Sequence, residues 1–129
     1  MVEVTLKQER IDAGAALVRR LDAVGMQLDA AFWFYFPDID AWKLVIAEVK
    51  VAKKGPKQVY REIQKLLRKY GSDFPELSLE DVTLAKPGAP IVSLLKVALK
   101  TGPGMSGIRF TDNVINGMHI DDAYIYRLQ

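Results

Sequence analysis

The chain has 129 residues, half of them hydrophobic and about a quarter charged, a balance typical of one globular domain. It contains no cysteine, which excludes disulfide frameworks and thiolate metal sites. No apolar run approaches the ~20 residues of a membrane span, and the charged N-terminus does not resemble a secretory signal. We therefore expect a single α+β domain over residues 1–129, located in the cytoplasm and without a membrane partner.

Apolar periodicity and turn residues predict eight elements. Gly55-Pro56 is expected to open a helix, since proline is favoured at the first helical position. Asn116-Gly117 predicts a two-residue hairpin turn, because a type I′ turn needs positive φ at both central residues. In chain order, the predictions are a helix at 5–24, strands at 28–36 and 42–51, a helix at 55–70, a strand at 81–85, a helix at 90–101 and strands at 108–115 and 118–128.

This order, α-β-β-α-β-α-β-β, defines the predicted fold class. Two hairpins and one short strand indicate a largely antiparallel sheet of about five strands. The three amphipathic helices are expected to pack mainly on one face of that sheet.

The strand at 28–36 carries aromatic side chains toward both faces. Phe32, Phe34 and Phe36 alternate with Trp33 and Tyr35, so the two sets point in opposite directions. Packing in the protein core is the favoured explanation. The alternatives are an interface at Trp33 and Tyr35 with a second copy of the chain or with another partner, and stacking against the bases of a single-stranded RNA.

Positive charge is concentrated in one segment, although the net charge is only +2. Residues 50–69 hold eight lysines and arginines and one acid, Glu62, so this segment carries +7 and the rest of the chain −5. Helical spacing predicts a cationic face opposite an apolar stripe, suited to an anionic partner such as nucleic acid or an acidic protein. The predicted binding residues are Lys53, Lys54, Lys57, Arg61, Lys65, Arg68 and Lys69.

Pro37-Asp38 and Glu48-Val49-Lys50 together match the signature of metal-dependent restriction-type nucleases. Both carboxylates would have to lie within ~2–2.5 Å of one ion. Asp38 is expected in the turn and Glu48 near the far end of the second strand, which separates them by roughly 20 Å. The favoured interpretation is therefore a turn aspartate and an unrelated glutamate at a strand end.

The last hairpin brings acidic side chains together. A two-residue turn places Val114 opposite His119 and Asp112 opposite Asp121, with the imidazole on the same face as the two carboxylates. Such a set suits a divalent cation. The simpler interpretation is a solvated hairpin end that tolerates like charges.

Three stretches of the chain resemble a family of small bacterial proteins that has no assigned activity. They are AFWFYFPDIDAWKLVIA, GPKQVYREIQ and SGIRFTDNVINGMHIDDAYIYRL. The resemblance implies a bacterial, single-domain protein, and it supplies no cofactor or catalytic residue.

The sequence thus favours a non-catalytic binding or assembly module, either a homo-oligomer or an accessory subunit, that uses the basic helix and needs no cofactor. The alternative is a metal-dependent hydrolase or nuclease that uses Asp112 and Asp121, or Glu48.

Overall fold

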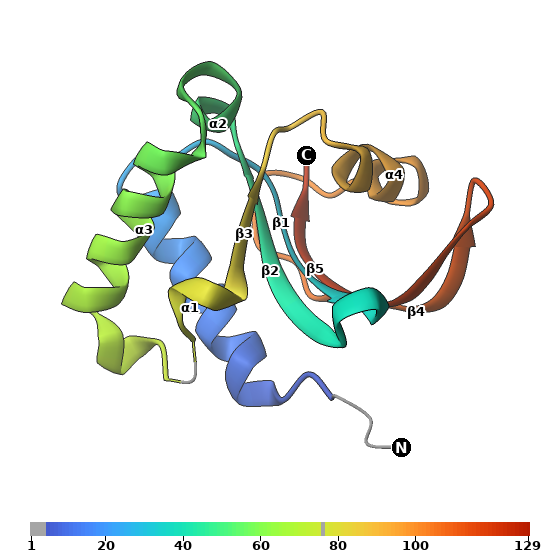
Figure 1. Cartoon of the computed structure of the whole chain (residues 1–129), viewed down its shortest axis with the longest axis horizontal. Coiled ribbons are helices and arrows are strands. Elements are labelled where there is room, and N and C mark those ends of the chain that lie inside the picture. Colours follow the sequence, from blue (N-terminus) through green and yellow to red (C-terminus); the bar gives the residue numbers. More distant parts are fainter. Residues whose placement is uncertain (1–4, 76) are drawn as a thin grey trace.

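The computed structural model describes residues 5–75 and 77–129. Within these residues, α-helices and strands alternate along most of the chain (Figure 1). The helices are α1 (Gln8–Ala23), α2 (Val49–Lys54), α3 (Pro56–Lys69) and α4 (Pro90–Ala98). The strands are β1 (Leu28–Phe36), β2 (Ala41–Glu48), β3 (Val82–Ala85), β4 (Ile108–Ile115) and β5 (Met118–Leu128).

The five strands form one mixed sheet in the order β3-β2-β1-β5-β4. The β1–β2, β1–β5 and β4–β5 pairs are antiparallel, whereas β2 and β3 are parallel. The parallel pair corrects the expectation of a largely antiparallel sheet. The chain leaves β2, crosses over through α2 and α3, and returns in the same direction, as a parallel neighbour requires.

A fourth helix, α2, replaces the end of the predicted second strand. The strand stops at Glu48, whose side chain accepts a hydrogen bond from the backbone N–H of Lys50 at 2.7 Å. This contact is a helix N-cap. Gly55 then adopts a φ of 82° between α2 and α3, a left-handed value that favours glycine.

Helices cover both faces of the sheet rather than mainly one (Figure 1). α1 and α3 pack on one face, where Leu17 and Ile63 meet Trp33 in the first core. α4 packs on the opposite face, where Val92 meets Phe32 in the second core. The aromatic residues of β1 point to both faces, so each face needs its own cover.

Trp33 lies inside the first core and is fully buried. Its Nε1 donates a hydrogen bond of 3.0 Å to the Tyr126 hydroxyl, which in turn donates to the carbonyl of Ile11 in α1. The Arg10 guanidinium covers the indole, 4.7 Å from the ring centroid. Core packing, the favoured explanation, is therefore confirmed for Trp33, and the alternative of an interface at this residue is corrected because α1 occupies that face. Tyr35 is half-buried and donates its hydroxyl proton to the Asp40 carboxylate.

The C-terminal hairpin has the predicted turn and register. Val114 pairs with His119 and Ile115 with Met118, and Asn116 and Gly117 have φ values of 49° and 78°. The hairpin extends past β1 and curves around α4 (Figure 1). Of the described helices, none is long and apolar enough to cross a membrane.

Candidate anion-binding face

α3 separates an apolar side from a cationic side. Val59 and Ile63 are fully buried against the sheet. Cations recur at intervals of three or four residues on the opposite side, because an α-helix turns once every 3.6 residues. We define the basic face as the side chains of Lys53 and Lys54 in α2 with those of Lys57, Arg61, Lys65, Arg68 and Lys69 in α3.

All seven side chains of the basic face are exposed. No carboxylate of the described residues lies within ion-pair distance of any of them. The cations that do form ion pairs lie elsewhere and are Arg10, Arg20, Lys96, Arg109, His119 and Arg127. The basic face therefore presents to solvent positive charge that no ion pair with residues 5–75 or 77–129 neutralises.

Two of the acids that follow α3 are bound to α1 rather than to the basic face. Asp73 accepts from Arg20 at 2.8 Å, and Asp81 accepts from Arg10 at 3.0 Å. Glu62, the one acid within the basic segment, is half-buried and forms no ion pair with a described residue. Because Asp73 and Asp81 pair with α1, the cations of α3 form no ion pair with an acid in the part of the chain that the structure describes.

The cations of α3 form a row that is inclined to the helix axis, because four residues make slightly more than one turn. Lys57 and Lys69 are twelve residues apart, which corresponds to ~18 Å along the helix axis at 1.5 Å per residue. Lys53 and Lys54 are the last two residues of α2 and precede Gly55 at the entrance of α3. α3 lies at one side of the molecule, with its outer surface away from the sheet (Figure 1). The row can therefore contact an extended anion along its whole length.

The nuclease-like residues are not brought together. Glu48 pairs with Leu28 at one end of the β1–β2 hairpin, whereas Asp38 lies in the 3₁₀ turn (Pro37–Ile39) at the other end. Glu48 is 1% exposed, and its carboxylate also accepts from the backbone N–H of Gln27 at 3.3 Å. One carboxylate oxygen therefore binds the start of α2, and the other binds the end of the loop between α1 and β1.

His119 stands between the two carboxylates that were candidate metal ligands. Its Nε2 lies 2.6 Å from Asp112 and its Nδ1 lies 2.7 Å from Asp121. Both ring nitrogens face carboxylate oxygens, so the doubly protonated imidazolium satisfies both contacts. Among the described residues, no group of three histidine or acidic side chains is arranged to hold a metal ion.

Stability should depend on pH through His119. The hydrogen bond to Asp112 raises the pKa of His119, and Asp121 raises it further, against the opposing effect of desolvation. The stabilisation is complete below the ordinary histidine pKa of ~6.5 and is lost as pH rises through the raised value. We expect His119→Gln to lower the melting temperature at about pH 5 and to change it little at about pH 9. A deficit that stays constant across that range would contradict this assignment.

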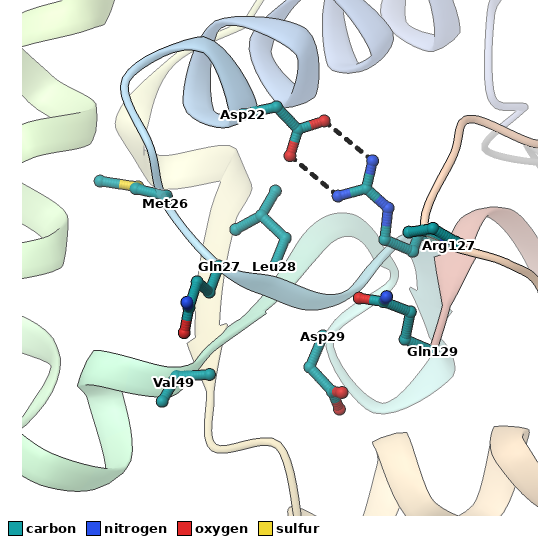
Figure 2. Close-up of a pocket in the computed structure, with 9 residues that line it drawn as sticks. Asp22, Met26, Gln27, Leu28, Asp29, Val49, Arg127 and Gln129 are labelled. Atoms are coloured by element: carbon teal, nitrogen blue, oxygen red, sulfur yellow. Dashed lines mark hydrogen bonds and ion pairs between the residues drawn. The ribbon is translucent and has the colours of Figure 1, made fainter.

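The structure also contains a pocket of about 450 Å³ that the sequence did not indicate (Figure 2). Arg127 lies at its wall and donates to both oxygens of Asp22, at 2.9 and 2.8 Å. Asp29, also in the lining, forms an ion pair with Lys96 of α4. The charged groups of this pocket are therefore compensated within the chain, in contrast to those of the basic face.

Comparisons of the chain with protein-family models, curated proteins and solved structures gave no significant match. The resemblance to small bacterial proteins thus stays a prediction.

Proposed function

We propose that this chain is a non-catalytic binding module that contacts an anionic partner through the basic face. The observation that carries the proposal is the exposure of seven cations that have no ion pair among the described residues. Lysine and arginine side chains left without counter-charges attract polyanions and raise their local concentration.

The strength of this contact should depend on salt. Exposed charges are screened over ~10 Å at 0.1 M salt, whereas a buried apolar interface is largely insensitive to it. Binding through the basic face should therefore weaken steeply as salt is added.

Retention on immobilised heparin, a sulfated polyanion, tests the proposal. We expect Arg61→Glu/Lys65→Glu to elute at much lower salt than the unmodified chain. The matched control is Lys7→Glu/Lys100→Glu, which changes the net charge equally at exposed lysines outside α2 and α3. Equal loss of retention in both variants would show an effect of net charge alone, and it would contradict a role for the basic face.

A further inference from the structure

We infer that the anionic partner is double-stranded nucleic acid, contacted through its phosphates with little dependence on base sequence. This inference rests on the proposed function of the basic face and adds the chemical class of the partner. Four observations support it: the composition of the basic face, the contacts of the aromatic residues near it, its shape, and the burial of the other side of α3.

The composition of the basic face is that of a nucleic-acid interface rather than a protein interface. Protein interfaces are enriched in aromatic residues and methionine and depleted in lysine. Five of the seven side chains here are lysines. The large exposed hydrophobic residues of the described chain all lie outside α2 and α3, and they are Val24, Ile39, Val97, Val114 and Met118. The face therefore has no apolar centre around which an acidic protein would dock.

The aromatic residues of α3 and its C-terminus are already engaged. Tyr60 packs against the first core, and its hydroxyl accepts a hydrogen bond of 3.1 Å from the backbone N–H of Leu84. Tyr70 is covered by the Arg20 guanidinium, 3.6 Å from its ring centroid. Proteins that bind single strands stack bases on free aromatic rings. Among the described residues of α2 and α3, no such ring is available, and this favours a duplex whose bases stay paired.

The shape of the basic face suits a regular, rigid polyanion. Lys57, Arg61 and Lys65 follow one another at intervals of four residues, which is ~6 Å along the axis. The row of ~18 Å spans the axial rise of about five base pairs at ~3.4 Å each. Charged ends on flexible stems can adjust to phosphates at that spacing, because a lysine acts as a point charge without a fixed bonding direction.

α3 is also held flat against the body of the protein. Val59 and Ile63 are fully buried, so one side of the helix is committed to the sheet. A helix that reads bases enters the major groove and presents side chains such as asparagine, glutamine, arginine or lysine to base edges. The outermost positions here are mainly lysines, whose point charges contact phosphates without a fixed bonding direction, and this favours contact with the sugar–phosphate backbone and weak discrimination between sequences.

Fluorescence anisotropy can test the partner class directly. The probes are labelled DNA and RNA duplexes of about 20 base pairs, their separate strands, and polyglutamate as the acidic polypeptide. We expect at least one duplex to bind about tenfold or more tightly than either of its strands, and two duplexes of unrelated sequence to bind within about threefold of each other.

The salt dependence gives a second readout. Each phosphate contact contributes about −0.9 to the slope of log affinity against log salt. We expect a slope of about −4 to −6 for the unmodified chain, and a slope shallower by about 2 for Arg61→Gln/Lys65→Gln, which removes two charges and keeps residues compatible with a helix. The control Lys7→Gln/Lys100→Gln should retain the unmodified slope.

The outcomes separate this inference from the proposed function. Binding of polyglutamate but of no duplex would overturn the inference and leave the binding module intact. Tighter binding of single strands than of either duplex would do the same. Failure to bind any of these polyanions, together with no retention on heparin, would overturn both.

Discussion

Replacement of Gly14 by alanine should destabilise the protein by about 2–4 kcal/mol, even though alanine is the better helix former. Gly14 lies on the buried side of α1, and a Cβ there would be 2.5 Å from the Tyr126 hydroxyl and 2.7 Å from Trp33 Nε1. Helix propensity alone would stabilise the alanine variant by about 1 kcal/mol. The expected loss is larger because the methyl group must displace a buried hydrogen bond in a packed core.

Urea unfolding of Gly14→Ala and Gly71→Ala would isolate this steric effect. A Cβ at Gly71 would meet no described atom within 4 Å, so its replacement should change the free energy of unfolding by less than about 0.5 kcal/mol. Tyr126→Phe removes the closest atom, and the double variant Gly14→Ala/Tyr126→Phe should therefore be more stable than the sum of the two single effects predicts. Simple additivity would contradict the proposed clash.

The close contact between Gly14 and Tyr126 could not be predicted from the sequence. A glycine inside a helical pattern is a weak local signal, whereas its meaning here comes from Tyr126, more than a hundred residues away in the chain. The Trp33 side chain is similar. Its alternation with Phe32 and Phe34 was predictable from the sequence, but the packing of α1 over its indole ring was not.

Predictions that depended on strict backbone stereochemistry are confirmed. Asn116-Gly117 has positive φ at both positions, as its turn requires, and the register of β4 and β5 follows from it. Gly55-Pro56 opens α3 for the same kind of reason. In contrast, the switch from β2 to α2 depends on Glu48, whose carboxylate binds both the helix start and the backbone of Gln27. That partner comes from a different part of the chain.

The direction of β3 also could not be predicted from the residues around it. A strand of four residues carries no signal for its orientation, and the hairpins before and after it suggested an antiparallel sheet. The crossover through α2 and α3 sets the direction instead. The same crossover places α3 beside α1, on the first face of the sheet, with its cations outward.

The positions of the cations in the candidate site were predictable from the sequence, but their lack of ion pairs was not. Spacing alone placed the lysines and arginines of α3 opposite its apolar stripe. Whether they would meet acids from elsewhere depended on tertiary structure. Asp73 and Asp81 are near α3 in sequence, yet they bind Arg20 and Arg10 of α1. The availability of the basic face is thus a property of the fold and not of the helix by itself.

Loss of the ion pair between Asp22 and Arg127 should also lower the free energy of unfolding strongly. The loss should be larger when Asp22 is removed than when Arg127 is removed. The Arg127 side chain is 5% exposed and that of Asp22 is 36% exposed. Removal of the carboxylate by Asp22→Ala would leave a buried guanidinium whose one remaining hydrogen bond to a described residue is to the carbonyl of Gly104, 3.2 Å from its Nε. Broken buried pairs typically cost 3–5 kcal/mol, and the partial exposure of Asp22 reduces the expected loss to about 2–4 kcal/mol.

Arg127→Met removes the buried charge instead, and it leaves a carboxylate that water already reaches. We expect this variant to lose about 1–2 kcal/mol, less than Asp22→Ala, because a partly exposed group is hydrated when its partner is removed. The double variant should be close to Arg127→Met alone, since Asp22 has little left to stabilise once the guanidinium is gone. Chemical unfolding of the three variants measures this order. If Arg127→Met were the more destabilised single variant, the hydrogen bonds that the guanidinium donates, and not the penalty of an unpaired buried charge, would be the main contribution of this residue.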